Sequence, residues 1–397
     1  MTGRELRMPE IDFAVARLPD LHEVLAELRA VEPVSRIVFA GKATWLLNDY
    51  ETVSQHISSD AVLSAPAAYE PLSLTTVGRV LPTMSGRQHQ LNRAVVSRVF
   101  FPGRMREYAQ SLFAEEAQRL ADVLEGRDRV DLVAEFTRVY TFNNIARILG
   151  LPREHVDRLQ GWADRLMRSF SHLEDAEAAG REMAEYLMPL IESRRADPTD
   201  DVISLLTRSK VGDEGLSDEE VLAFCRNLFP AAIDTSTNSL GSLIRYALQD
   251  RDLWRKLPVD RELREKTVHE LLRWEPPLVM IPRQCVESVE IGGHPIAVGD
   301  DVRLCITGAH DDPKQFPDPR AFRIDRGGSH LTFGHGEHFC LGTQMAKRVL
   351  EKGVEVLASR HPDMMLCEDE ENPIEGGVLR GPRSLWVKPT GRTAQAS

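Results

Sequence analysis

The segment that begins at Ser217 constrains the fold more than any other part of the chain. Ser217 is a good helix N-cap, and Asp218, Glu219 and Glu220 place acids in the first turn. The helix that starts here extends to about Asp250, which is long for a globular protein. Because its apolar residues lie on every side, we expect the helix to be central and buried.

The rest of the sequence predicts a mainly α fold with small β-sheets. From 87 to 260 the pattern is mostly helical and is interrupted by proline and glycine. The stretch 63–86 has scattered apolar residues, several prolines and no clean period, so we expect a long loop there. Further helices are expected over 20–30, 49–58, 262–274 and 342–359, a hairpin within 34–48, strands over 286–291, 296–298 and 302–306, and a final hairpin over 378–387.

The composition argues against several classes of protein. A net charge of -12 over 397 residues disfavours a nucleic-acid partner, which needs a basic face. No run approaches the ~20 apolar residues of a membrane span, and the N-terminus has no apolar signal region. Five scattered cysteines fit a reducing cytoplasm. Without a linker, we expect a single domain over 1–397 with a flexible tail at 391–397.

Cys340 lies in a loop punctuated by glycine, directly before the helix expected over 342–359. The positive end of a helix dipole and free backbone N–H groups favour the thiolate, which is the form that binds metal. Glycines also let a large flat group lie against the backbone. A lone cysteine in this setting suits a haem iron. The local alternative is zinc held by His335, His338 and Cys340, although no fourth ligand is evident.

This loop resembles the haem-binding signature of the cytochrome P450 family, Phe-x-x-Gly-x-(His/Arg)-x-Cys-x-Gly, and Gly336 fills one of its fixed positions. The resemblance implies a P450-like haem-thiolate fold, haem b as the cofactor and O2 as the co-substrate. It also implies that Cys340 is the axial ligand of the iron. The haem contacts expected in the loop are Phe333, Gly334, His338, Cys340 and Gly342.

The central helix carries an acid beside a hydroxyl, Asp234 and Thr235. Taken alone, Thr235 is expected to bond back to the preceding turn and Asp234 to pair with a surface cation. The family has (Ala/Gly)-Gly-x-(Asp/Glu)-Thr at this place, where the pair delivers protons for oxygen activation. The resemblance therefore makes Asp234 and Thr235 the catalytic residues. Ala232, where the family usually has glycine, departs from the pattern.

Glu270 and Arg273 stand three residues apart on one helix face, which alone indicates only a common surface pair. In the family this pair is buried behind the haem and supports the cysteine loop. A third partner usually comes from the irregular segment that follows, and Ala321 occupies its place here. We expect either Arg320 or Arg323 to substitute.

The two haem propionates need cations or hydrogen-bond donors. His89 and Arg93 share a helix face, and the resemblance makes them propionate contacts, together with Arg283 and His338. All these motifs follow the family order along the chain. The segment 309–313 departs from the Ala-Asn-Arg-Asp-Pro of many bacterial members, and the sequence assigns it no role.

The implied reaction is monooxygenation of an apolar organic substrate. The chain has no flavin or dinucleotide fingerprint, so a separate ferredoxin and its reductase are expected to supply electrons. The ferredoxin would dock near Cys340 on a face made basic by Arg98, Arg104, Arg106, Lys347 and Arg348. Candidate walls of the substrate pocket, each of which also suits plain core, are Leu72, Leu74, Val77, Leu81, Phe229, Ile233, Val279, Met280, Val378 and Leu379.

Two other functions fit the same motifs. The haem-thiolate site would also suit peroxide-driven oxidation or a rearrangement without external electrons, although the Asp234–Thr235 pair favours the oxygenase. The second alternative is a non-catalytic protein that binds haem or zinc.

Overall fold

The computed structural model describes residues 11–167, 169 and 172–389, so the tail expected over 391–397 lies outside the described residues. The chain forms two compact units. The first unit comprises Met1–Tyr69, His269–Cys340 and Pro373–Gly381, and the second comprises Glu70–Val268, Leu341–Asn372 and Pro382–Ser397. The single-domain organisation stays a prediction. No helix in the described part of the chain is both long and apolar enough to cross a membrane.

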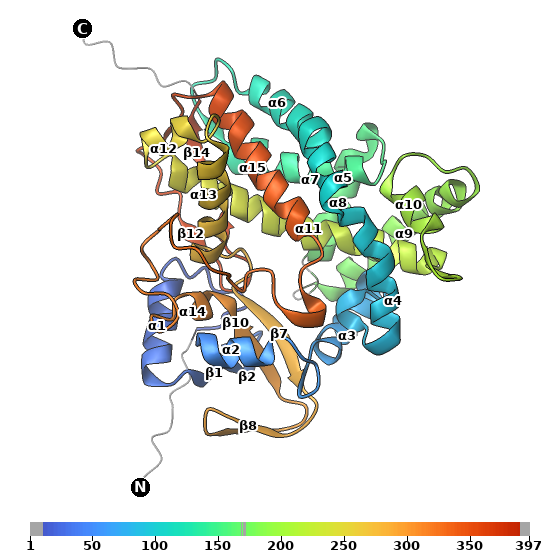
Figure 1. Ribbon diagram of the computed structural model, residues 1–397, viewed down its shortest axis with the longest axis vertical. Helices are drawn as coiled ribbons and strands as arrows, with labels where there is room; N and C mark the ends of the chain where they lie inside the picture. The colour runs from blue at the N-terminus through green and yellow to red at the C-terminus, as the bar shows by residue number, and fades with distance from the viewer. Residues whose placement is uncertain (1–10, 168, 170–171, 390–397) are drawn as a thin grey trace. The chain divides into compact units, whose positions relative to one another are not determined.

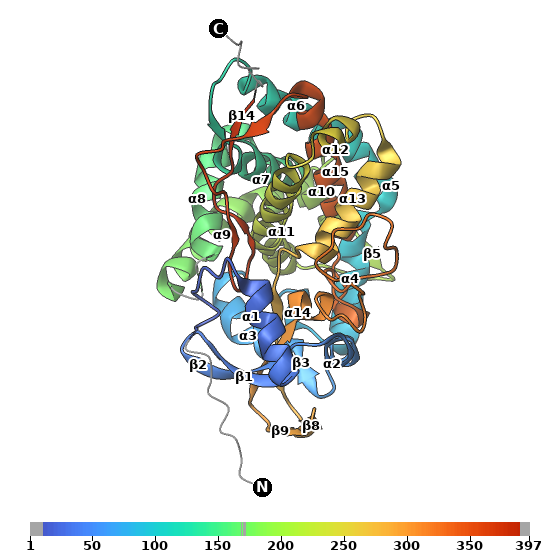
Figure 2. The same ribbon diagram turned by 90° about the vertical axis from the view of Figure 1, so that its left-hand side faces the viewer.

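The first unit is built on a five-stranded sheet with an apolar core on each face. Strand β10 shows how the pleat divides the cores, because Val302 and Leu304 point into one core and Cys305 into the other. Helix α1 packs beside α14 (Figure 2). In sheet order the strands are β1 (Val34–Phe39), β2 (Lys42–Leu47), β10 (Asp301–Cys305), β7 (Met280–Cys285) and β3 (Leu63–Ser64). The other elements are α1 (Leu21–Val31), α2 (Tyr50–His56), α14 (Ile306–His310), η6 (Gly336–His338) and the hairpin β8 (Val289–Ile291) to β9 (His294–Ile296).

The second unit is helical and surrounds α11 (Asp218–Ala247), the 30-residue helix predicted from Ser217 (Figure 1). Its other helices are α4 (Gly86–Val96), α5 (Pro102–Tyr108), α6 (Ala114–Val123), α7 (Arg138–Ile148), α8 (Val156–Met167), α9 (Leu173–Ala196), α10 (Val202–Arg208), α12 (Arg251–Lys256) and α15 (Thr343–Arg360). Short helical turns are η1 (Leu81–Thr83), η2 (Ser97–Phe100), η3 (Ala109–Phe113), η4 (Val133–Thr137) and η5 (Arg153–His155). The short strands are β4 (Val130–Asp131), β5 (Lys210–Val211), β6 (Glu214–Gly215), β11 (Met365–Leu366) and β14 (Trp386–Lys388). Three elements include residues of both units: α3 (Ala65–Thr76), α13 (Arg261–Trp274) and the strand pair β12 (Ile374–Glu375) and β13 (Gly381–Pro382).

Helix α11 begins as predicted, with a capping box at Ser217. The Glu220 N–H donates to Ser217 Oγ at 3.2 Å, and the Ser217 N–H donates to Glu220 Oε2 at 2.9 Å. Helix α11 packs against α7, α9 and α15. Gly353 on α15 lets the helices approach closely, since a Cβ there would lie 3.0 Å from both Leu240 and Tyr140 side chains. The helix is therefore the buried centre of its unit.

The structure corrects the expected loop over 63–86. This stretch instead forms β3, the helix α3 and the turn η1. Its apolar residues show no helical period because most of α3 is only half-buried, and Pro71 inside the helix removes a backbone donor. The missing apolar period therefore led to a wrong prediction, because α3 is a helix with only a weak apolar face.

The strand predictions were partly right. The hairpin within 34–48 is confirmed by β1 and β2, and the three later strands exist with shifted bounds as β8, β9 and β10. Strand β7 was missed because Pro282 lies within it. The final hairpin over 378–387 was wrong, because β12 pairs with β13 while β14 pairs with β11 and β4.

Candidate active site

The loop that carries Cys340 folds back on itself within the first unit. The Cys340 N–H donates to the Phe333 carbonyl at 2.7 Å, and the Gly334 N–H donates to the Leu331 carbonyl at 2.8 Å. Gly334 and Gly336 both have φ of 71°, a conformation that favours glycine. A Cβ on Gly336 would lie 2.5 Å from the Ser58 carbonyl oxygen, so a side chain is excluded there. The loop leaves Cys340 exposed and free of any disulfide.

A buried ion pair lies in the same unit, at the end of α13. Arg273 Nε and Nη2 donate to the two carboxylate oxygens of Glu270 at 2.8 and 2.7 Å. The two side chains are only 2% and 4% exposed, so the pair is not a surface pair. Burial alone would raise the pKa of Glu270, but hydrogen bonds from Arg273 and from the Arg323 N–H outweigh it, and the pKa is lowered. Glu270 is therefore held as a carboxylate.

The third partner of this pair is Arg326, which the sequence did not identify. Arg326 Nε lies 3.3 Å from Glu270 Oε1, and its Nη2 donates to the Ala321 carbonyl at 2.9 Å. The prediction of Arg320 or Arg323 was wrong. Arg323 contributes only its backbone N–H, at 3.0 Å, while the Arg320 side chain donates to the Trp274 carbonyl at 2.6 Å. The segment turns back after Ala321, so a guanidinium five residues later reaches the same carboxylate.

Arg283 on β7 is a buried cation suited to an anionic group. The residue is 3% exposed, and its Nη2 donates to the Ile57 carbonyl at 3.1 Å. Its Nε is buried and has no hydrogen-bond partner among the described residues. Burial lowers the pKa of Arg283, so a nearby anion would stabilise its charged form. The role of Arg283 as a propionate contact stays a prediction.

His338 lies in the cysteine loop with its Nε2 2.6 Å from Asp60 Oδ2. Among the described residues, the metal-ligand atoms of Asp60, Glu337 and His338 form the one group of three within 4.8 Å of one another. His335 and Cys340 are not part of it. The zinc alternative, with His335, His338 and Cys340 as ligands, is therefore not supported by the geometry.

Asp234 and Thr235 lie on α11 in the second unit. Arg138 Nη1 lies 3.4 Å from Asp234 Oδ1, and the same guanidinium pairs with Asp164 on α8. Burial raises the pKa of Asp234, and the nearby Asp164 adds to this effect against the attraction of Arg138. The Thr235 hydroxyl donates to the Ala231 carbonyl at 2.9 Å. These are the local contacts expected from the sequence, and the role of both residues in proton delivery stays a prediction.

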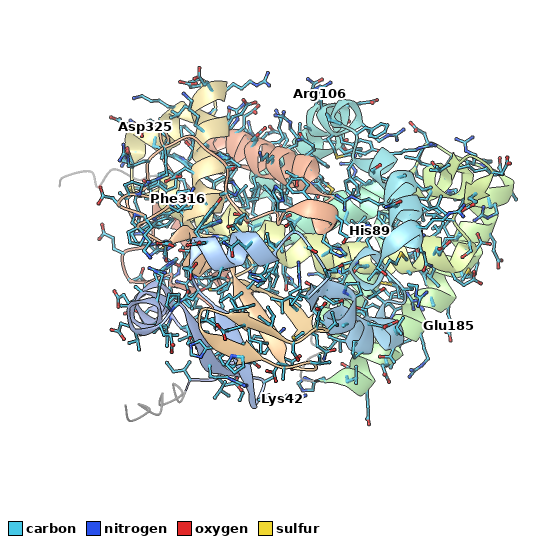
Figure 3. All side chains as sticks on the ribbon, turned by 60° about the horizontal axis from the view of Figure 1, so that its bottom comes forward. Lys42, His89, Arg106, Glu185, Phe316 and Asp325 are labelled. Carbon is cyan, nitrogen blue, oxygen red and sulfur yellow. The ribbon has the colours of Figure 1, made fainter. Side chains whose placement is uncertain are left out.

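His89 and Arg93 lie four residues apart on α4, also in the second unit, and His89 is labelled in Figure 3. His89 is 1% exposed, so it is not the ordinary surface residue that its pattern alone would suggest. Asn92 on the same helix donates to Glu220 Oε1 at 3.1 Å and thereby ties α4 to the start of α11. The propionate role of His89 and Arg93 stays a prediction.

Two of the predicted substrate-wall segments meet in the first unit. The Val279 N–H donates to the Val378 carbonyl at 2.8 Å, and Leu278 forms a β-bridge with Leu379. Val279 and Met280 are also part of an apolar core. The sequence allowed these residues to be either pocket wall or plain core, and their role in a pocket stays a prediction.

A buried ion cluster fixes the ends of these two segments. Glu275 accepts from Arg380 Nε at 2.7 Å, and His22 lies between Glu275, at 3.1 Å, and Asp311, at 2.5 Å. Burial alone would raise the pKa of Glu275, but His22 and the neighbouring arginines outweigh it and lower the pKa to about 2. Glu275 therefore stays a carboxylate, and its contact with Arg380 holds the segments together.

In the second unit the other candidate wall residues differ in how far their side chains are exposed. Leu74 is 46% exposed, and Phe229 is buried with its ring centroid 5.5 Å from that of Phe142. Val77 and Ile233 are buried, and Leu72 and Leu81 are half-buried. Their role in a substrate pocket stays a prediction.

The five cations of the predicted docking face all belong to the second unit. Arg106 is exposed, and Arg104 donates to the Tyr108 hydroxyl at 3.1 Å. Arg98 donates to the Lys210 carbonyl at 2.8 Å, and Arg348 pairs with Glu351 at 2.5 Å. An acid therefore lies beside at least one of these cations, and the docking face stays a prediction.

The cytochrome P450 family model matches residues 162–360. Among curated proteins, the chain is similar to mycinamicin IV hydroxylase/epoxidase of Micromonospora griseorubida, with 32% identity over 91% of this chain and 94% of that protein. Among solved structures, it is similar to the bacillaene polyketide synthase cytochrome P450 PksS of Bacillus subtilis, with a TM-score of 0.86, 28% identity and coverage of 94% and 97% of the two chains. It is also similar to P450BioI in complex with an acyl carrier protein that carries hexadec-9Z-enoic acid, with a TM-score of 0.84, 26% identity and coverage of 93% and 98%.

Proposed function

The chain belongs to the cytochrome P450 family, and from this premise we propose how its residues divide the work of a haem-thiolate monooxygenase. The protein binds haem b and uses O2 and a redox partner. It is an oxidoreductase that inserts one oxygen atom into an organic substrate and releases the other as water. The observation that best supports the roles of individual residues is the loop over 331–340. Its glycines shape the backbone, and Cys340 is exposed.

We propose that Cys340, as a thiolate, would hold the haem iron. The bound haem supplies oxygen activation, which a thiolate ligand promotes by donating electron density. Gly336 keeps the loop against Ser58 with no side chain between them, and the exposed thiol is accessible to a ligand. The buried Glu270–Arg273 pair on α13 would support this loop, as the family resemblance implies.

Arg283, His338, His89 and Arg93 are the residues that would hold the propionates. Arg283 contributes the strongest support, because its guanidinium is buried with an unused Nε donor. The other three contribute donors whose positions along the chain match the family motifs. The donor set therefore fits haem.

Asp234 and Thr235 would deliver protons. Burial raises the pKa of Asp234, so its carboxyl group takes up a proton more readily than an exposed aspartate would. Arg138 opposes this by attracting the carboxylate, and its second partner Asp164 competes for the same guanidinium. Thr235 would release its bond to the Ala231 carbonyl in order to pass a proton on.

Replacement of Asp234 by asparagine is expected to slow turnover about a hundredfold, because an amide cannot supply the proton. The measurement is the rate of product formation in H2O and in D2O, and the solvent isotope effect should increase in the variant. Glu219→Gln, an exposed acid on the same helix, is the matched control and should leave both values unchanged. Unchanged turnover and isotope effect in Asp234→Asn would contradict the proton role.

Electrons would come from a ferredoxin that docks on the face with Arg98, Arg104, Arg106, Lys347 and Arg348. An acidic ferredoxin would complement these cations despite the net charge of -12. A cytoplasmic location is part of this proposal, because a reducing compartment keeps the five separate cysteines as thiols.

Charge reversal in Arg104→Glu is expected to slow reduction by ferredoxin about tenfold at low salt, with a smaller difference at high salt. Stopped-flow reduction at several ionic strengths measures this. Lys42→Glu, an exposed lysine on the β1–β2 hairpin, is the control (Figure 3). Equal reduction rates for Arg104→Glu and Lys42→Glu would remove the docking proposal.

The substrate we propose is an apolar organic molecule in contact with the segments 278–280 and 378–380. A screen of macrolides, steroids and fatty acyl compounds for a change in haem spin state identifies the class. The monooxygenase assignment predicts turnover of the hit with ferredoxin, reductase and O2. Steady turnover with peroxide, and none with ferredoxin and O2, would replace it with the peroxide-driven alternative.

A further inference from the structure

We propose that His310 is a positioning residue that ties the end of α13 to the start of the cysteine loop and thereby fixes the place of Cys340. This proposal rests on the proposed role of Cys340 as the iron ligand. It concerns a residue in the segment 309–313, to which the sequence assigned no role. His310 is 1% exposed and lies at the end of α14.

Both ring nitrogens of His310 have backbone partners. The Leu331 N–H donates to Nε2 at 2.8 Å, so Nε2 is an acceptor and carries no proton. Nδ1 lies 2.9 Å from the Arg273 carbonyl, which can only accept, so Nδ1 carries the proton. The two contacts therefore define one neutral tautomer, in which the ring bridges α13 and the loop.

The surroundings of the ring maintain this neutral form. Burial lowers the pKa of His310 to about 3 against the opposing effect of the Arg273 carbonyl. The charged groups that face it are Arg273, Asp311 and Glu270. Phe316, labelled in Figure 3, packs edge-on at a ring-centroid distance of 5.9 Å. A protonated ring would lose the acceptor for the Leu331 N–H. Burial and the two bridging hydrogen bonds therefore require the same neutral form of His310.

The bridge reaches Cys340 through a short series of backbone contacts. Leu331 accepts from the Gly334 N–H at 2.8 Å, and Phe333 accepts from the Cys340 N–H at 2.7 Å. The Thr332 hydroxyl makes a second link by donating to the Leu272 carbonyl at 2.6 Å. The residues before the turn are therefore held to the last turn of α13 at two adjacent positions, and Cys340 is hydrogen-bonded to the residue that follows them.

The side chain at 310 links two backbone groups by hydrogen bonds, which bulk alone cannot do. A neutral imidazole has one donor and one acceptor, and so does an amide group used in this way. A leucine of similar bulk has neither. The bridge therefore depends on paired hydrogen bonding, and packing volume alone does not supply it.

Three variants separate these roles. His310→Leu keeps bulk and removes both hydrogen bonds, and His310→Asn keeps a donor and an acceptor but loses volume. Val302→Ala creates a cavity in the core of the same unit without touching the bridge. The first readout is hydrogen exchange of the peptide over 331–340, measured by mass spectrometry on the purified protein. The second is the rate at which the ferrous carbonyl complex loses its thiolate-type Soret band.

We expect His310→Leu to increase both rates about tenfold, because a buried backbone N–H and a carbonyl lose their partner. His310→Asn should remain within about twofold of the parent, and Val302→Ala should change neither rate while it lowers the melting temperature. The proposal is overturned if His310→Leu behaves like Val302→Ala, or if His310→Asn is worse than His310→Leu. A parent protein with no thiolate-type band would instead refute the role of Cys340, while the exchange data would still decide the bridge.

Discussion

Replacement of Glu270 by glutamine is expected to lower the free energy of unfolding by about 3–5 kcal/mol, because the buried guanidinium of Arg273 loses its counter-charge. Arg326, which also donates to this carboxylate, loses the same partner. Glutamine preserves the shape of the side chain, so the loss reports on charge and on paired hydrogen bonding. Chemical unfolding and the haem content of the purified protein measure the effect, and both should fall together.

The matched control for this prediction is Glu262→Gln on the same helix. Glu262 is an exposed acid that pairs with Lys266 at 2.7 Å, one turn along α13. An exposed pair of this kind contributes only about 0.5 kcal/mol. If Glu270→Gln were as stable as Glu262→Gln and retained its haem, the Glu270–Arg273–Arg326 cluster would not support the cysteine loop as we propose.

Replacement of Cys340 by serine is expected to reduce ferredoxin-driven substrate oxidation by more than about a hundredfold, because a serine hydroxyl is a poor substitute for a thiolate ligand. The loop should keep its fold, since its internal hydrogen bonds come from the backbone. The measurement is product formation with ferredoxin, reductase and O2, normalised to bound haem. Cys367→Ser, at a buried cysteine of the second unit, is the control and should retain activity. Oxidation by Cys340→Ser at the parent rate would refute the ligand assignment.

Local chemistry explains what could be predicted from the sequence. The capping box at Ser217 and the apolar residues around α11 are determined by neighbours in the chain, and the structure confirms the helix and its burial. The unusual backbone conformation of the cysteine loop was predictable from its glycines, because positive φ and close backbone contact both require glycine. The family motif then supplied haem as the ligand, which no local argument could specify.

The parts that could not be predicted depend on how distant segments meet. Arg326 reaches Glu270 only because the chain turns back after Ala321, and two nearer arginines looked equally suitable. His310 bonds to Arg273 and Leu331, which are 37 and 21 residues away along the chain. Helix α3 lies where the sequence predicts a loop, because its apolar residues follow no clear helical period. In each case tertiary contacts decide the structure.

The absorption spectrum of the reduced protein under carbon monoxide tests the central claim most directly. If Cys340 ligates the haem iron as a thiolate, the parent protein and Cys367→Ser will show the red-shifted Soret band of a haem-thiolate complex. Folded Cys340→Ser will lack this band. A haem-loaded parent without the band, or a Cys340→Ser protein that retains it, would contradict the account.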